Sequence, residues 1–297
     1  MNTLYLCGAG NSEGVRLAMR IAELRKRWNQ VVLLDDERTK QGKSILGVPI
    51  VGGFDLLEAV RSDDEVQNLV TRTARGRMAA RAKIARHCGR FATLLSPDVD
   101  VLGVEIRGDA TVYHNATLGP ESILEAGSVV WMGAVVGHES FVGQGSIVAT
   151  NSVLNARVTL GQGVYVGTNA TVLPEVSIGD WATVGAGSVV MSDVPAGATA
   201  IGIPAEVVDF GRVEEKDTSG LTEVEGTILA VFRSVMKDSA LSAEDNFFYC
   251  GGTSLDAMRL KTEVEQLTGE TLPLVEIMRH PTARGLAQFL LEPVAAA

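Results

Sequence analysis

The sequence predicts three domains in succession: an α/β N-terminal domain, a left-handed parallel β-helix and a small all-helical C-terminal domain. Short apolar runs alternate with helical patterns at the start of the chain, which indicates a βαβ unit. An aliphatic residue then recurs at every sixth position, and helical periodicity takes over near the C-terminus. We expect the domains at 1–95, 96–205 and 221–297, with a charged linker at 206–220.

The six-residue repeat runs without a miss through Ile106, Val112, Leu118, Leu124, Val130, Val136, Val142, Val148, Leu154, Leu160, Val166, Val172, Ile178, Val184 and Val190. This period fits neither a 3.6-residue helix nor a two-residue strand alternation. It fits a chain that turns a corner every six residues, so that three hexads close one triangular coil. Glycine follows seven of these residues (119, 137, 143, 161, 167, 179 and 185). We expect these glycines to turn the corners at positive φ.

The N-terminal segment begins with TLYLCGAG, a strand that ends in a glycine turn, followed by the amphipathic helix EGVRLAMRIAELRKRW and the strand QVVLLDD. Gly8, Gly10 and Gly14 would let backbone N–H groups and the helix N-terminus approach a phosphate. A tight strand-to-helix turn without a ligand is the alternative. The spacing does not complete G-x-G-x-x-G, so a nicotinamide cofactor is not expected.

Composition limits the function classes. Hydrophobic residues make up 46% of the 297 positions and aromatics only 5%, as a narrow coil interior requires. The formal charge of −10 argues against a nucleic-acid surface. Three cysteines show neither disulfide nor metal spacing, and neither a signal peptide nor a membrane span is recognised. A soluble, cytoplasmic protein without a metal site is therefore expected.

His138 is the outstanding candidate for chemistry in the repeat. It stands two positions after the inward Val136 and one after Gly137, so its side chain should lie outside a coil corner. An imidazole titrates near neutrality and can act as a general base. Glu139 follows and could orient the ring. An ordinary solvated surface histidine is the alternative interpretation.

Residues 4–205 resemble the sugar acyltransferases of the sialic acid O-acetyltransferase and bacillosamine N-acetyltransferase type. The resemblance rests on YLCGAGNSEG, LLDD, GHESFVGQGSIVATNSVL and VSIGDWATVGAGSVVMSDVPAGATAIGIPAE. It implies a homotrimer with active sites between neighbouring coils, with His138 as the base and Glu139 as its helper. It also implies a nucleotide-linked amino sugar, with these residues near the nucleotide: Gly8, Gly10, Gly14, Asp35 and Asp36.

Three positions depart from that family pattern. Trp131 replaces a small polar residue that helps to hold the acceptor sugar, and Ile147 replaces another polar position. Both changes predict a more apolar cleft, so Trp131 is a candidate substrate-binding residue. Glu206 replaces a cation suited to the phosphates of coenzyme A. Its negative charge favours a donor that lacks those phosphates.

The C-terminal sequence DNFFYCGGTSL (Asp245 to Leu255) resembles the attachment motif of peptidyl and acyl carrier domains, and the likeness covers about 222–291. It implies that Ser254 carries a covalent 4'-phosphopantetheine arm. An N-cap serine is the alternative. Thr253 replaces a residue that is usually His in peptidyl carriers, which leaves the acyl group open.

The expected function is an acyltransferase that moves an acyl group from the phosphopantetheine thioester to a nucleotide-linked sugar, an amine being favoured over a hydroxyl. A phosphopantetheinyl transferase and an acyl-loading enzyme would be partners, and acyl-coenzyme A is a further candidate donor. The first alternative is coenzyme A-dependent acylation of a substrate tethered on the carrier. The second, of another class, is a non-catalytic trimeric scaffold that displays carrier domains.

Overall fold

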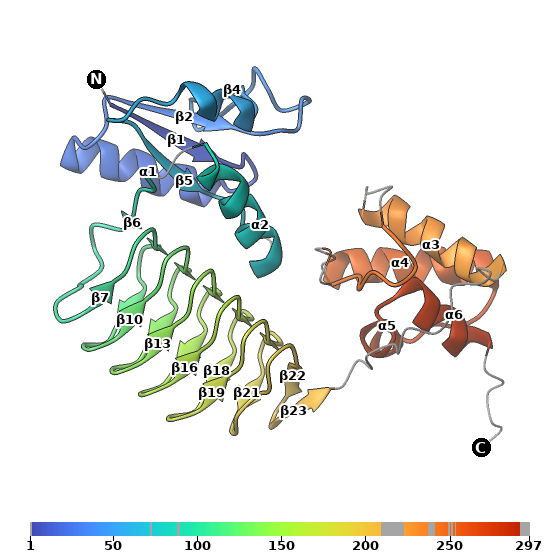
Figure 1. Ribbon diagram of the computed structural model, residues 1–297. Coiled ribbons are helices and arrows are strands. Elements are labelled where there is room, and N and C mark those ends of the chain that lie inside the picture. Colours follow the sequence, from blue (N-terminus) through green and yellow to red (C-terminus); the bar gives the residue numbers. More distant parts are fainter. Residues whose placement is uncertain are drawn as a thin grey trace. The chain divides into compact units, whose positions relative to one another are not determined.

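The computed structural model describes residues 2–71, 73–87, 90–208, 223–236, 241–248, 250, 252 and 254–291. The chain divides into two compact units, Met1–Val207 and Val208–Ala297 (Figure 1). The first unit holds the α/β domain and the coil, and the second is helical. Among the described residues, no helix is long and apolar enough to cross a lipid bilayer.

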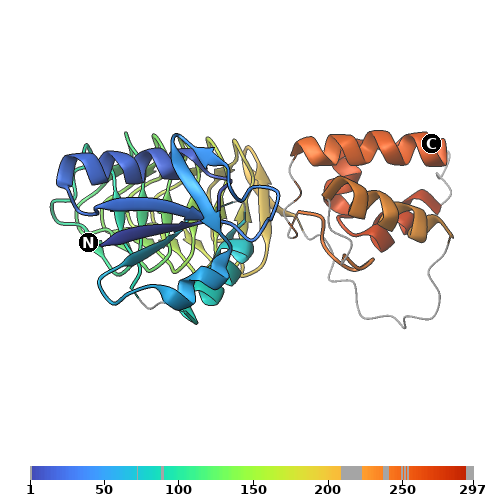
Figure 2. The ribbon, with the colours of Figure 1, turned by 90° about the horizontal axis from the view of Figure 1, so that it is seen from above.

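The α/β domain contains a five-stranded sheet of order β3-β4-β2-β1-β5, parallel except for the β3–β4 pair. Its elements are β1 (Thr3–Cys7), α1 (Ser12–Arg25), β2 (Gln30–Leu34), β3 (Ser44–Ile45), β4 (Val48–Gly52), η1 (Phe54–Ala59), β5 (Glu65–Asn68) and α2 (Ala74–Ala85). The predicted strand, helix and second strand are all present. Seen from above, the sheet and α1 lie over the coil (Figure 2).

The repeat forms the predicted left-handed parallel β-helix, whose short strands, two residues long except for β22 and β23, stack into three flat faces. Face 1 contains β6, β8, β11, β14, β17, β20, β22 and β23; face 2 contains β9, β12, β15, β18 and β21; face 3 contains β7, β10, β13, β16 and β19. The strands are β6 (Leu94–Leu95), β7 (Glu105–Ile106), β8 (Thr111–Val112), β9 (Thr117–Leu118), β10 (Ile123–Leu124), β11 (Val129–Val130), β12 (Val135–Val136), β13 (Phe141–Val142), β14 (Ile147–Val148), β15 (Val153–Leu154), β16 (Thr159–Leu160), β17 (Tyr165–Val166), β18 (Thr171–Val172), β19 (Ser177–Ile178), β20 (Thr183–Val184), β21 (Val189–Val190), β22 (Thr199–Gly202) and β23 (Ala205–Val208).

The aliphatic repeat lines the coil interior, where fourteen of its fifteen members are buried and Ile106, in the first coil, packs against the same core. Between β7 and β21, neighbouring strands of one face are eighteen residues apart along the chain, as Val129 pairs with Ile147. Glu206, expected in the linker, lies in β23. The expected linker residues from 209 onward lie outside the described residues.

The prediction that the seven glycines turn the corners at positive φ is wrong. None of them has a positive φ, and the left-handed residue falls two positions later, as at Gly145 after Gly143. Six of the seven instead lie where two coils approach closely. A Cβ on Gly143, for example, would lie 2.3 Å from the carbonyl oxygen of Gly161 in the next coil. Glycine is needed there for space and not for dihedral freedom.

Helix α2 lies along the corner between faces 3 and 1. Arg81 and Met78 approach two successive coils at Gly127 and Gly145, and Arg75 lies over the ring of Trp181, which belongs to the fourth coil and covers Gly163 in the third. Three residues of helix rise about 4.5 Å, and neighbouring strands are roughly 4.8 Å apart. This near match lets one helical side chain meet each coil, and it fixes the α/β domain on face 1.

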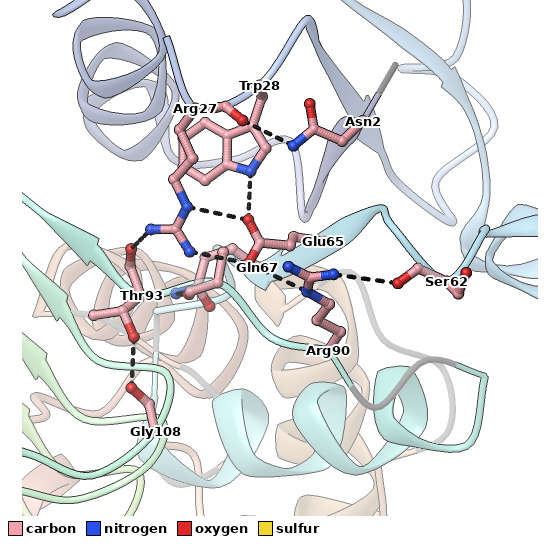
Figure 3. Close-up of polar contacts among 10 residues, drawn as sticks. Asn2, Arg27, Trp28, Ser62, Glu65, Gln67, Arg90, Thr93 and Gly108 are labelled. Carbon is pink, nitrogen blue, oxygen red and sulfur yellow. Dashed lines mark hydrogen bonds and ion pairs between the residues drawn. The ribbon is translucent and has the colours of Figure 1, made fainter. Parts of the chain in front are cut away.

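A buried carboxylate reinforces this junction (Figure 3). Glu65 accepts hydrogen bonds from Arg27 (2.9 and 3.1 Å) and from the Trp28 indole (2.6 Å). Burial alone would raise the pKa of Glu65, but these hydrogen bonds outweigh it and hold the pKa below its usual value. Arg27 also donates to the Thr93 carbonyl, and the Thr93 hydroxyl donates to the carbonyl of Gly108 in the first coil.

The second unit contains the helices α3 (Glu223–Met236), α4 (Ser254–Thr268), α5 (Leu274–Arg279) and α6 (Ala283–Leu291). Their apolar faces enclose a core around Phe232, Phe247 and Leu260. Three helices match the predicted helical segments, whereas the short α5 was not expected. Glu225 on α3 and Arg284 on α6 form a largely buried ion pair at 2.7 Å.

Candidate functional site

His138 lies on the corner between faces 2 and 3, between β12 and β13, with 49% of its side chain exposed. The outward position predicted from the repeat is therefore present in the structure. One oxygen of Glu139 (Oε1) lies 3.5 Å from His138 Nδ1. This distance exceeds that of a good hydrogen bond, so the carboxylate lies beside the ring without a strong bond to it.

Gly119, one coil earlier, fixes how closely the His138 corner approaches its neighbour. A Cβ on Gly119 would lie 2.4 Å from the His138 backbone nitrogen and 2.7 Å from its Cα. Only glycine fits at this distance without moving one of the two coils. The backbone of His138 is thereby packed directly on the preceding coil.

The same corner carries a column of charged residues in the left-handed conformation. Glu121, Glu139, Arg157 and Glu175 have φ values of 61°, 57°, 59° and 66°, one in each of four successive coils. A side chain other than Gly or Asn costs about 1 kcal/mol or more in this region. We call these four residues the charged column.

Ion pairs connect three members of the charged column, Glu139, Arg157 and Glu175, to one another beside His138. The second oxygen of Glu139 (Oε2) lies 3.7 Å from Arg157 Nη1, and Arg157 Nη2 lies 2.7 Å from Glu175 Oε1. The hydrogen bonds to Glu175 raise the pKa of Arg157 above its usual value, so its charge is permanent. The sequence analysis did not identify Arg157. It lies eighteen residues, which is one coil, from both Glu139 and Glu175, and this separation indicates direct neighbours on one corner.

Trp131 lies on the corner between faces 1 and 2, at the other end of β12 from His138. Its ring stacks on Tyr113 with the ring centres 4.4 Å apart and the planes 5° from parallel. Tyr113 is fully buried, which raises its pKa to about 12. Its hydroxyl accepts a hydrogen bond from Asn11, which also caps α1 through Gly14 N (2.8 and 2.9 Å). Trp131 is thus linked to the glycine turn of the α/β domain.

Ile147 does not line a cleft, contrary to the expectation from the sequence. It is fully buried and packs between face 1 and the α/β domain, in one cluster with Val129 and Leu94. Val129, Ile147 and Tyr165 hold outward positions on face 1 and all pack against the α/β domain. Ile147 therefore belongs to the domain junction.

The glycine turn and Asp35 meet at the carboxyl edge of the sheet, the usual ligand edge in such folds. Asp35 accepts hydrogen bonds from the backbone N–H groups of Ala9 (2.7 Å) and Glu37 (2.9 Å). Asp36 turns toward α2 and pairs with Lys83 at 2.6 Å. Burial opposes ionisation of Asp36, but this contact and the Phe54 N–H lower its pKa. Both carboxylates therefore already have partners within the domain.

The three positions of the turn hold glycine for different reasons. A Cβ on Gly14 would lie 2.7 Å from Leu69, and Gly8 has a φ of +106°. Both are therefore explained by the turn itself. A Cβ on Gly10 would meet no atom within 4 Å, so Gly10 has open space beside it. Gly10 is the position of the turn where a ligand could approach the backbone.

Ser254 is the first residue of α4, and Gly252 two positions earlier packs on Phe247. A Cβ on Gly252 would lie 2.4 Å from the Phe247 ring, and Gly252 N donates to the Phe247 carbonyl at 2.8 Å. The loop is thus closed onto the core just before the serine. The positive end of a 15-residue helix suits a phosphodiester on that serine. Tyr249, Gly251 and Thr253 lie outside the described residues.

Comparisons with known sequences match the helical unit and the coil to two different families. Residues 226–290 match the family described as "Phosphopantetheine attachment site", and residues 157–191 match "Bacterial transferase hexapeptide (six repeats)". Atromentin synthetase greA of Suillus grevillei is 38% identical over 72 residues, 23% of this chain. Surfactin synthase subunit 1 of Bacillus subtilis is 38% identical over 71 residues, 24% of this chain. The chain spans only 8% and 2% of these two relatives.

Solved structures resemble the first unit. The acetyltransferase domain of PglB from Neisseria gonorrhoeae, in complex with acetyl coenzyme A, is 26% identical with a TM-score of 0.62, covering 70% of this chain and 100% of that one. PerB from Caulobacter crescentus, in complex with CoA and GDP-perosamine, is 25% identical with a TM-score of 0.59, covering 70% of this chain and 97% of that one. The chain thus joins a hexapeptide-repeat transferase domain, with the fold of the sugar acetyltransferases, to a phosphopantetheine carrier domain.

Proposed function

We propose that the protein is an acyltransferase that moves an acyl group from a phosphopantetheine thioester on Ser254 to the amine of a nucleotide-linked sugar, with His138 as the general base. The observation that carries the proposal is His138 itself. It is exposed on a rigid coil corner beside the Glu139 carboxylate, in a chain that also contains a carrier domain. The similarity to PerB, which was solved with GDP-perosamine, supports an amino sugar as the acceptor.

The chain's own residues would act as follows. Bound to Ser254, the phosphopantetheine arm supplies the acyl thioester. His138 takes a proton from the acceptor amine as its nitrogen attacks the acyl carbon. The C–N bond forms, the C–S bond breaks, and the proton passes to the departing thiolate. Glu139 stabilises the imidazolium of His138 between these two proton transfers.

Outward side chains near His138 support assembly into a homotrimer. Val135 and Val153 on face 2 and Ile123 and Phe141 on face 3 point away from the coil interior and are only partly buried. Apolar side chains at outward strand positions are typical of a face that another subunit covers. We therefore include a homotrimer in the proposal, in which the β-helix of a neighbouring subunit completes the site.

One observation favours a coenzyme A thioester as the acyl donor. The PglB domain was solved with acetyl coenzyme A, so the coil of the present protein could take its donor from free coenzyme A. The carrier would then hold the acceptor, and the acyl group would be added to a substrate already on the arm. Glu206, which is exposed in β23 where a cation would suit coenzyme A, favours the carrier-borne donor instead.

Acetyl transfer to GDP-perosamine tests the proposal, with either acetyl-loaded holo-protein or apo-protein plus acetyl coenzyme A as donor. His138→Ala should lower turnover about 10²- to 10⁴-fold. His114→Ala is the matched control, because His114 also stands two residues after an inward valine, on another corner. Ser254→Ala should abolish transfer from the loaded protein.

The remaining outcomes separate the alternatives. Full turnover of Ser254→Ala with acetyl coenzyme A would exclude the carrier-borne donor. An intact mass that shows the acetyl group added to a substrate on the arm would establish the second mechanism. If the unmodified protein showed no acetyl transfer, the coil would be a non-catalytic scaffold for carriers. If His138→Ala kept the turnover of His114→Ala, His138 would not be the base.

A further inference from the structure

The charged column is not required by the coil. On the corner between faces 1 and 2, the left-handed positions hold Asn115, Gly133, Asn151, Asn169 and Gly187, the residues that this conformation favours. On the corner between faces 2 and 3, four successive coils instead hold charged residues, although Asn or Gly would fold more readily. His138 lies within the same four coils.

The Glu139 carboxylate lies between His138 and Arg157. Its Oε1 lies 3.5 Å from His138 Nδ1, and its Oε2 lies 3.7 Å from Arg157 Nη1. Each oxygen therefore has its own partner. A glutamate side chain that is 44% exposed has several accessible rotamers, and a cation on one oxygen restricts them.

Glu175, in the next coil, binds the Arg157 side chain. Its Nε and Nη2 donate to Glu175 Oε1 at 3.1 and 2.7 Å, which leaves Nη1 turned toward Glu139. The backbone N–H of Arg157 also donates to the His138 carbonyl at 2.9 Å. Arg157 thus contacts both members of the His138–Glu139 pair, once through the backbone and once through the side chain.

We infer that Arg157, anchored by Glu175, is a positioning residue that holds the Glu139 carboxylate against His138. This inference rests on the proposed function, because it concerns how the base is oriented. Arg157 acts through Glu139 and not on the substrate. Its loss should therefore change the rate of the chemical step more than the binding of the acceptor.

Arg157 also sets the charge around the imidazole. Glu121, Glu139 and Glu175 are the carboxylates of the charged column, and Arg157 is its single cation. Removing that cation would leave uncompensated negative charge near His138, which favours the protonated ring. The acidic limb of the pH–rate profile should then move to higher pH, since the base must be neutral to act.

Arg157→Asn is the informative variant, because Asn suits the left-handed backbone and the backbone N–H remains. It should lower kcat at pH 7 about threefold to tenfold with KM unchanged, and move the acidic limb of kcat/KM upward by about half a pH unit. Arg157→Lys should recover most of the activity. Arg107→Asn is the matched control, because Arg107 is an exposed coil arginine that pairs with Glu105 and Glu125 on another corner, and it should leave kcat and KM unchanged.

The double variant Arg157→Asn/Glu175→Asn separates orientation from charge. It removes one charge of each sign, so the acidic limb should return toward that of the unmodified protein while kcat stays low. An unshifted profile in Arg157→Asn, or a raised KM with unchanged kcat, would overturn the inference. The His138→Ala variant keeps the two proposals distinguishable: if it is inactive and Arg157→Asn behaves normally, only the positioning role fails.

Discussion

Gly119→Ala should damage the site through the backbone alone, without removing any functional group. The added Cβ would lie 2.4 Å from His138 N and 2.7 Å from both His138 Cα and the Gly137 carbonyl carbon. Ordinary van der Waals contact begins near 3.4 Å, so the His138 corner must move by about 1 Å. The clashing atoms are all backbone, so no side-chain rotation can relieve the contact.

The size of the effect follows from that displacement. A shift of about 1 Å in a catalytic group costs on the order of 10²-fold in rate, and overpacking costs about 1–3 kcal/mol of stability. Acetyl transfer and thermal unfolding would measure the two effects separately. We expect a large loss of kcat together with a lowered midpoint of unfolding.

Gly185→Ala is the matched control for this substitution. Gly185 occupies the same place in the repeat, but a Cβ there would meet only side-chain atoms, the nearest being Ile201 Cγ1 at 3.1 Å. Side chains can give way by a few tenths of an ångström, so this variant should stay close to the unmodified protein. Equal kcat values for Gly119→Ala and Gly185→Ala would refute the argument that coil packing positions His138.

Further predictions concern stability. Glu65→Gln should cost about 2 kcal/mol in chemical denaturation, with the exposed Glu58→Gln near neutral. Because folding lowers the pKa of Glu65, its contribution is present above the unfolded value of 4.5 and lost as pH falls, so denaturation at pH 3 and pH 7 should show a smaller difference at pH 3. Asn11→Ala should cost about 1–2 kcal/mol through the lost cap and the lost bond to Tyr113, measured in the same way. In the carrier unit, Glu225→Gln leaves Arg284 with a weakened partner and should lower the unfolding midpoint of that unit in calorimetry.

The sequence predicted the parts of the fold that depend on local periodicity. The inward positions of the coil, the βαβ start and three carrier helices follow from spacing alone. The position of His138 outside a corner followed from the same spacing. The glycine roles did not, because the space between two coils and the φ of a residue both select glycine, and the sequence does not distinguish the two causes.

Contacts between coils were missed for a different reason. The Tyr113–Trp131 stack and the Glu139–Arg157 pair each join residues eighteen positions apart, which is three hexads. Once the triangular coil is recognised, a separation of eighteen marks direct neighbours on one corner. The junction around Glu65 could not be found in this way, because its partners come from separate elements without a shared period.

The left-handed positions provide a general argument for where the site lies. From Val112 to Val184, the third residue after each inward aliphatic residue has a positive φ, thirteen positions in all, and eight of them are Gly or Asn. Of the five exceptions, Trp181 packs over Gly163 and against Arg75 and so has a structural reason. The other four form the charged column beside His138. Where a repeat sets the same conformation at every turn, departures from the preferred residue cost stability. The concentration of four such departures on one corner is therefore best explained by the chemistry proposed for His138. Exchanging all four residues for Asn should stabilise the coil and lower acetyl transfer.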